Sequence, residues 1–228
     1  SNAIAKNWEV RYLYANQGSF PATSGNYDCV TGYPPQLNMN RYITLKCTKD
    51  TLISIDLSAD SANTPIKIVS GAWDTTIIAD INWIGSISYP SYDTIMTIYG
   101  DVNMFYCEDN RINITGLDVS HNIGLTHLDC SHNSLTSLNI SVCTVLEYLD
   151  CSVNNLTSLD VSKNTALTHL ECTSNDLTSL DVSACTALIS LECYNNKFST
   201  AGYDSLMCSL PSRNSGDNAN FFPLYVAN

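Results

Sequence analysis

The sequence predicts a solenoid whose short coils stack and align their strands into one parallel β-sheet. Two observations carry this prediction. A buried-type residue recurs with a fixed period, because Cys130, Cys151, Cys172 and Cys193 are 21 residues apart and Cys107 precedes them by 23. The residues around each of these cysteines are also nearly the same from copy to copy, so five units of one kind follow each other between residues 102 and 200.

The repeated pattern identifies the kind of solenoid. The first complete copy reads Leu125-x-x-Leu128-x-Cys130-x-x-Asn133-x-Leu135. This is the leucine-rich repeat signature L-x-x-L-x-L-x-x-N/C-x-L, with cysteine in the third apolar position. A single unit cannot bury its apolar face, so the leucines and cysteines should point inward and stack on those of the next unit. We expect the asparagine that follows each strand to satisfy backbone groups at the bend: Asn133, Asn154, Asn175 and Asn196.

Charge and hydropathy exclude several partners. Ten Lys and Arg against 22 Asp and Glu give a net charge of -12, which disfavours nucleic acid and anionic membranes as partners. No run of 18 apolar residues is present, so no transmembrane segment is predicted. Ser1-Asn2-Ala3 is typical of the remnant of a cleaved expression tag, so we expect any signal peptide or lipid anchor to have been removed.

The repeat period explains most of the ten cysteines. Five lie in the inward position, and Cys143 and Cys185 alternate with Asn122 and Asn164 on the return segment. Strand neighbours are too far apart for the Cβ separation that a disulfide needs, so these seven are predicted to be free thiols. A bridge between Cys29 and Cys47 is left open. No metal site is expected, because the Cys and His spacings are not those of a zinc site.

The flanks of the repeats are predicted to close the two ends of the solenoid. Residues 1–40 are interpreted as a strand at 5–14 followed by an irregular connector. Residues 41–101 are expected to form a β-rich N-terminal cap domain, with strands near 41–47, 52–57, 66–69, 76–81 and 94–99. Residues 102–200 are the repeats. Residues 201–228 form a C-terminal cap, in which a helix from Ser199 to Leu210 precedes a strand from Phe221 to Tyr225.

The copies at 156–167 and 177–188, Leu-Thr-Ser-Leu-Asp-Val-Ser and the residues after it, resemble leucine-rich repeat proteins of Bacteroides and related bacteria, loosely similar to internalins. The resemblance covers about residues 98–225. It implies an exported or surface-attached binding module without catalysis or cofactor. The segment from Asn7 to Tyr12 resembles a strand that follows the C-terminal cap in such proteins, so it could pair with another array or chain.

Function is expected on the outward positions of the repeat strands, which face the concave surface. One column there is Tyr106, Asp129, Asp150, Glu171 and Glu192. It stacks four carboxylates about one strand spacing apart, although like charges side by side destabilise a sheet. Two interpretations are open: a solvated acidic face without a binding role, or an anionic strip that binds a ligand between aromatic side chains. The candidate binding residues are Tyr106, His127, Asp129, Tyr148, Asp150, His169, Glu171, Glu192 and Tyr194.

A second polar column on the return segment, Asp118, Asn139, Asp160 and Asp181, is followed two residues later by serine and predicts turn hydrogen bonds instead. An active site needs a unique constellation, whereas these residues recur in every unit, so no enzyme is predicted. We expect a monomeric, extracellular or surface-attached module that binds a protein, with a basic protein as the partner that the acidic column suits. The alternatives are a carbohydrate-binding protein, on the tyrosine side of the concave face or on Trp73 and Trp83, and an adhesive spacer. The two tryptophans are otherwise expected in the core.

Overall fold

The computed structural model describes residues 36–212 and 219–222. From Leu37 onward the described chain belongs to one compact unit. The predicted strand at 5–14, the connector up to residue 35 and the pairing expected for Asn7 to Tyr12 lie outside the described residues. The division into a cap at 41–101 and repeats at 102–200 stays a prediction, because strands of both regions share the same sheets.

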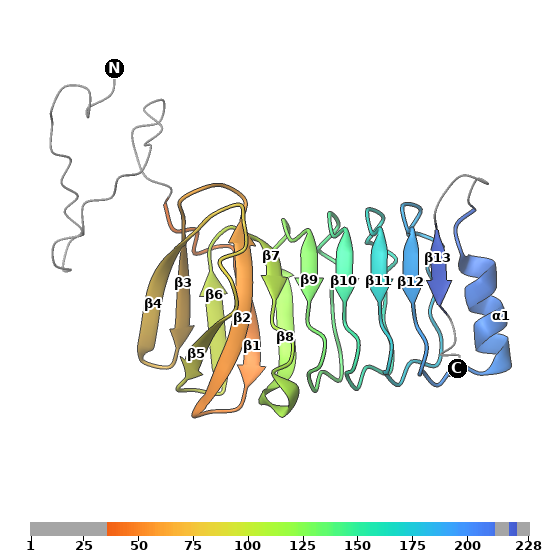
Figure 1. The fold of residues 1–228 in the computed structure, drawn as a ribbon, viewed down its shortest axis with the longest axis horizontal. Coiled ribbons are helices and arrows are strands. Elements are labelled where there is room, and N and C mark those ends of the chain that lie inside the picture. The colour runs from red at the N-terminus through yellow and green to blue at the C-terminus, as the bar shows by residue number, and fades with distance from the viewer. Residues whose placement is uncertain (1–35, 213–218, 223–228) are drawn as a thin grey trace, which may run out of the picture. The chain divides into compact units, whose positions relative to one another are not determined.

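The fold is a leucine-rich repeat solenoid preceded by an N-terminal β-sandwich, and the two share their sheets (Figure 1). One sheet has five strands, in the order β4 (Trp73–Ala79), β3 (Thr64–Ser70), β6 (Ile95–Tyr99), β1 (Tyr42–Cys47) and β8 (Ile114–His121). The other has eight, in the order β13 (Asn220–Phe222), β12 (Ser190–Glu192), β11 (His169–Glu171), β10 (Tyr148–Asp150), β9 (His127–Asp129), β7 (Val102–Tyr106), β2 (Thr51–Ala59) and β5 (Ile87–Ser91).

The repeat strands pair in parallel and in the register that the period predicts. Leu128 pairs with Leu149, and Leu149 with Leu170. The same register continues back to Phe105 and on to Leu191 and Phe221. A shift by one residue would move the inward leucines to the outer face, so the stacked core itself fixes this register.

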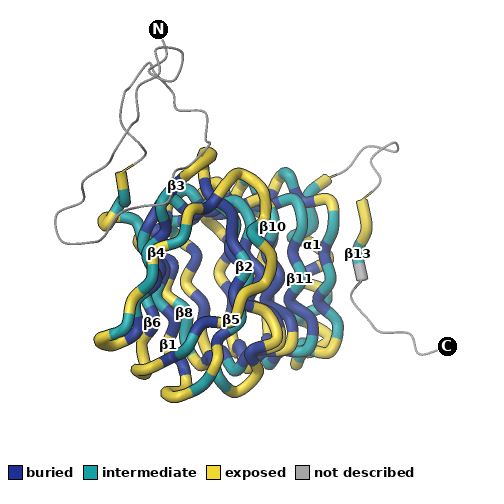
Figure 2. Tube along the Cα trace, turned by 60° about the vertical axis from the view of Figure 1, so that its left-hand side comes forward, coloured by how far each residue is buried: buried dark blue, intermediate teal, exposed yellow. Residues whose placement is uncertain are grey.

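The core confirms the inward positions. Leu125, Leu128, Cys130 and Leu135 are all fully buried, and their equivalents in the later repeats are buried as well, except Phe198 in the last repeat, which is partly buried; the dark inner segments in Figure 2 show this core. All seven repeat cysteines are free and buried, as predicted. Cys47 is also a free thiol, with its Sγ 3.0 Å from Ser91 Oγ, while Cys29 lies outside the described residues.

The asparagine ladder closes each bend. Asn154 Nδ2 donates to the carbonyls of Cys130 and Cys151 at 3.0 and 3.1 Å. Its Oδ1 accepts from the backbone N–H of Leu135, 2.9 Å away in the preceding repeat. Asn175 and Asn196 repeat this arrangement. One side chain therefore satisfies backbone groups of two successive coils, which supports the predicted structural role.

Two strands were not predicted. β5 contains Pro90, which reads as a loop residue in sequence, but β5 is the edge of its sheet, where a proline costs no ladder hydrogen bond. β8 is the return segment of the first repeat, and it is a strand because β1 pairs with it in antiparallel fashion. The later return segments have no such partner and stay irregular. The short 3-10 helix Arg111–Asn113 precedes β8.

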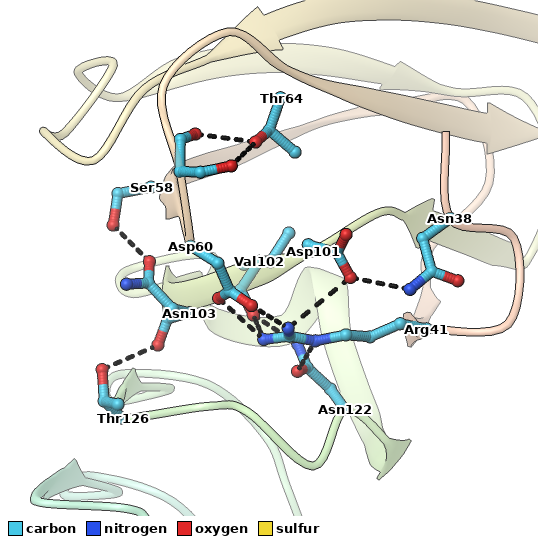
Figure 3. Close-up of polar contacts among 11 residues, drawn as sticks. Asn38, Arg41, Ser58, Asp60, Thr64, Asp101, Val102, Asn103, Asn122 and Thr126 are labelled. Carbon is cyan, nitrogen blue, oxygen red and sulfur yellow. Dashed lines mark hydrogen bonds and ion pairs between the residues drawn. The ribbon is translucent and has the colours of Figure 1, made fainter. Parts of the chain in front are cut away.

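Arg41 ties the sandwich to the first repeat (Figure 3). Its guanidinium forms an ion pair with Asp60 and donates to the carbonyl of Val102. Its Nε donates to Asn122 Oδ1 at 2.6 Å. The side chain of Arg41 is only 11% exposed, so these contacts neutralise a nearly buried charge at the junction.

The helix predicted after the last repeat is present, whereas the predicted strand from Phe221 to Tyr225 is described only as far as Phe222. Helix α1 (Thr200–Ser209) starts at Ser199, whose Oγ accepts from the N–H of Gly202 at 3.1 Å, and Leu206 is its buried residue. The rings of Phe198 and Tyr203 are 5.1 Å apart, edge to face. Beside the helix, β13 adds one more parallel strand next to β12. Within residues 36–212 and 219–222, no helix is both long and apolar enough to cross a membrane.

Candidate functional site

The solvent side of the eight-stranded sheet carries two rows of side chains, here called the ladder face. The register places one residue from each of six strands, β2, β7 and β9 to β12, in a carboxylate row: Asp56, Tyr106, Asp129, Asp150, Glu171 and Glu192. The second row, two residues earlier in β7 and in β9 to β12, is called the aromatic row: Met104, His127, Tyr148, His169 and Ser190. The structure thus aligns eight of the nine predicted residues as expected. The ninth, Tyr194, follows β12, and its carbonyl accepts from the N–H of Ser174.

The two central carboxylates of the row are largely covered, so the row is not uniformly exposed to water. Asp129 is 7% exposed and Asp150 is 9% exposed, whereas Glu171 and Glu192 are half-buried. The two aspartates are short and sit at the centre of the face, so neighbouring side chains cover them. Sequence spacing gives the alignment of a row but not this coverage.

Backbone groups hold the two aspartates in place. Asp129 Oδ1 accepts from the N–H of Ser131 at 2.9 Å. Asp150 Oδ1 accepts from the N–H and the hydroxyl of Ser152, at 2.8 and 2.6 Å. These bonds fix the carboxylates at the strand ends without neutralising them. Among the described residues, every ion pair lies elsewhere: on Arg41, Lys67, Arg111 and Lys197.

Burial raises the pKa of three carboxyl groups on this face, and neighbouring negative charges add to the rise. Burial raises the pKa of Asp150 to about 7, against the opposing hydrogen bonds from Ser152, and the charges of Asp129 and Glu171 add to the rise. Burial also raises the pKa of Glu171, and the neighbouring charge of Glu192 contributes. Glu108 lies beside the row, two residues after Tyr106, and burial and the adjacent Asp129 raise its pKa. These side chains therefore form a cluster of carboxylates whose ionised state is unfavourable in the folded chain.

The aromatic row runs beside the carboxylates. The ring of Tyr148 lies 6.0 Å from His127 and 6.2 Å from His169. Threonine hydroxyls orient both imidazoles, because Thr126 Oγ1 is 3.1 Å from His127 Nδ1 and Thr168 Oγ1 is 2.9 Å from His169 Nδ1. Tyr148 Oη donates to Glu171 Oε1 at 3.3 Å and links the two rows. Burial lowers the pKa of His127, which favours a neutral ring.

The face extends into the N-terminal sandwich, which sequence reasoning missed. Asp56 of β2 pairs with Tyr106 and continues the carboxylate row by one strand. Trp83, expected in the core, is 38% exposed, and its ring centroid lies 4.1 Å from that of Tyr106. Trp73, in contrast, is partly buried and packs against the core. The alternation of β2 marks Asp56 as outward, but only the pairing of β2 with β7 brings it to this face.

The return-segment column has the turn role that the sequence predicted. Asp118, Asn139, Asp160 and Asp181 each accept from the backbone N–H of the serine two residues later, at 2.8 to 3.1 Å. Within the described ranges, no three His, Cys, Asp or Glu side chains are arranged to hold a metal ion.

Comparisons with known proteins give similarity to solved structures only. Neither protein-family models nor curated proteins match the chain. Among solved structures, it is similar to the functional domain of InlJ from Listeria monocytogenes, a structure described as including a cysteine ladder. The sequences are 32% identical, the TM-score is 0.45, and the match covers 54% of this chain and 30% of the InlJ chain. The chain thus spans less than a third of the length of that domain.

Proposed function

We propose that this chain is a non-enzymatic leucine-rich repeat module that binds a protein partner on its ladder face. We further propose that it belongs to an exported or surface-attached bacterial protein, as the likeness of residues 156–188 to such proteins implies. The repeat residues on the face recur from strand to strand, so none of them stands apart as a catalytic group.

One observation supports the proposal most strongly. The carboxylate row lowers the stability of the folded chain, and the fold can form without it. The core leucines, the thiols and the asparagine ladder account for the stacking of the coils. Placing like charges side by side on a sheet opposes that stacking, and burying them raises the penalty further. Asparagine or glutamine in the row would accept the same serine bonds without charge. Residues that weaken a fold in this way are typical of functional sites.

Binding a basic partner would remove the penalty. A lysine or arginine delivered to Asp129 or Asp150 would exchange repulsion for charge-assisted hydrogen bonds in a partly desolvated place. Aromatic side chains beside the charges are enriched at protein interfaces and add apolar contact area.

Carbohydrate binding is the second candidate, and the exposed Trp83 next to Tyr106 favours it. A sugar ring stacked on these aromatic faces would respond little to salt. A basic protein partner should instead bind much more weakly when the ionic strength rises from about 0.05 to 0.5 M, because exposed charges are then screened.

The test compares two double variants of equal charge. Asp150→Asn/Glu171→Gln neutralises the ladder face, and Asp160→Asn/Asp181→Asn neutralises the return segment while keeping its turn acceptors. Each protein is used to capture partners from an extract of the native environment. The proposal requires a protein captured by the wild type and the return-segment variant but lost with the ladder-face variant. Equal capture by both variants would contradict it.

A further inference from the structure

We infer that the partner presents an extended segment whose basic side chains recur at every second residue, and that this segment runs along the carboxylate row with its first basic residue against Trp83. This inference rests on the proposed function and specifies the chemistry of the partner.

The spacing of the row carries the first step. Strands of one sheet are about 4.8 Å apart, so the three steps from Asp129 to Glu192 span about 14 Å. Side chains on one face of an extended chain recur about every 6.7 Å, because each residue adds about 3.3 Å. Basic residues at alternate positions therefore span the length of the row, with three of them facing its four carboxylates from Asp129 to Glu192.

The pairing of the two rows carries the second step. A lysine or arginine has an apolar stem and a charged end, and the two parts prefer different surroundings. The rings of His127, Tyr148 and His169 offer a surface for the stems, and the carboxylates lie two residues further along each strand. Tyr148 joins the rows through its bond to Glu171. An acidic face that only contacts water would gain nothing from the aromatic row beside it.

The N-terminal end of the row supplies an independent observation. Asp56 Oδ1 is fully buried and has no hydrogen-bond partner, whereas buried carboxylate oxygens are normally satisfied. The loop that carries Trp83 is held over this strand, because the N–H of Ile84 donates to the carbonyl of Leu57 at 3.2 Å. Backbone N–H groups of Leu57, Ile84 and Gly85 contribute hydrogen bonds to the Asp56 carboxylate but leave Oδ1 without a partner, so the 38% exposed Trp83 lies beside a carboxylate with one unsatisfied oxygen. A cation over the face of a tryptophan is stabilised by the ring quadrupole, which selects a basic first residue.

Charge complementarity supports a basic occupant. The six described carboxylates along this path, Asp56, Glu108, Asp129, Asp150, Glu171 and Glu192, take part in none of the ion pairs found within residues 36–212 and 219–222. An acidic or neutral segment would leave these charges unpaired and remove water from them. A basic segment would compensate them.

The experiment uses two synthetic peptides of identical composition. One alternates lysine with threonine after a leading arginine, and the other groups all its basic residues at one end. Fluorescence anisotropy at low ionic strength gives the Kd of each for the full chain. We expect the alternating peptide to bind about tenfold more tightly, since one well-placed charged hydrogen bond is worth about that factor. Equal Kd values would overturn the inference, because they would indicate only general attraction to a negative protein.

Three variants test whether the peptide binds on the ladder face. Asp150→Asn/Glu171→Gln should weaken the alternating peptide about tenfold or more, and Trp83→Ala by about threefold to tenfold. Above about pH 8, where Asp150 is ionised, Asp160→Asn/Asp181→Asn removes the same charge and should change the Kd less than about twofold. Urea midpoints check that each variant is folded. An unchanged Kd in either ladder-face variant would overturn the proposed placement.

Failure of this inference can be separated from failure of the proposed function. If a captured protein requires Asp150 and Glu171 but contains no alternating basic segment, the binding face stands and the inference fails. If neither the captured protein nor the peptides respond to Asp150→Asn/Glu171→Gln, both fail.

Discussion

The ring centroids of Trp83 and Tyr106 lie 4.1 Å apart, which joins a loop of the N-terminal sandwich to the first strand of the solenoid. Tyr106 in turn pairs with Asp56 on one side and Asp129 on the other. The sandwich is therefore more than an end cap, because it contributes residues to the same face as the repeats. A truncation at the start of the repeats would remove both the cap and one end of the proposed site.

Neutralising Asp150 should stabilise the protein at neutral and alkaline pH. Its folded pKa is raised from an ordinary 3.8 to about 7, so ionisation favours the unfolded chain. The penalty is absent below pH 3.8, grows as pH rises and is complete above about pH 7. Asp150→Asn, which keeps the acceptor for Ser152, should raise the free energy of unfolding by about 2–4 kcal/mol near pH 8. Urea unfolding at several pH values measures this.

Asp160→Asn is the control with the opposite sign. Hydrogen bonds from Ser162 lower the pKa of Asp160, so its charge stabilises the folded state above the ordinary pKa and this stability is lost as pH falls through the folded value. The substitution should reduce stability near neutral pH and have no effect in strong acid. A stability gain for Asp150→Asn that does not change with pH would contradict the assigned burial of charge.

Replacing Val153 should relieve backbone strain. Every repeat has a left-handed residue two positions after its cysteine, and Val153 has φ 52° there. A β-branched residue is unfavourable in this region, whereas asparagine tolerates it. Val153→Asn should raise the free energy of unfolding by about 1 kcal/mol, and Asn195→Val, at φ 55° in the last repeat, should lower it by a similar amount. Equal effects of the two substitutions in thermal unfolding would refute this.

Two buried asparagines should respond differently to the same substitution. Asn154 uses both its amide nitrogen and its oxygen, and Asn154→Cys should leave the N–H of Leu135 without an acceptor. The cost should be about 3 kcal/mol in urea unfolding. Asn164 Nδ2 donates to the carbonyls of Ile140 and Cys143, but its Oδ1 has no partner; cysteine occupies this position in other repeats, where Cys185 Sγ donates to the carbonyl of Val161. Asn164→Cys should therefore cost less than about 1 kcal/mol. Similar losses of stability for both variants would show that the two asparagine positions do not differ in this way.

The repeat thiols should be unreactive in the folded chain. Burial raises the pKa of Cys143 and Cys185 to about 11, and burial also places those of Cys130 and Cys151 well above the ordinary value. Of the nine described cysteines, only Cys208 is exposed. A thiol reagent followed by peptide mapping should modify Cys208 alone among them, until urea opens the core. Labelling of Cys130 or Cys151 in the native chain would contradict the stacked interior.

The sequence was sufficient for everything that the period controls. A fixed repeat puts equivalent residues on neighbouring strands, so the inward cysteines, the asparagine ladder and the alignment of Asp129 with Asp150 could all be predicted. The turn bonds of Asp160 and Asp181 followed for the same reason. The features that could not be predicted depend on pairing between strands that do not belong to the repeated pattern. β8 is a strand only because β1 lies beside it, and Asp56 reaches the face only through β2 and β7. The burial of Asp129 and Asp150 depends on side chains of several strands at once.

Oxidative footprinting with a captured protein partner tests the central claim most directly. Hydroxyl radicals modify aromatic and sulfur side chains according to their exposure, and the chain offers reporters on and off the ladder face. If the partner lies along the carboxylate row, it should reduce labelling of Trp83 and Tyr148 and leave the exposed Tyr92 and Met207 unchanged. Protection of Tyr92 or Met207 with unchanged labelling of Trp83 and Tyr148 would contradict the account.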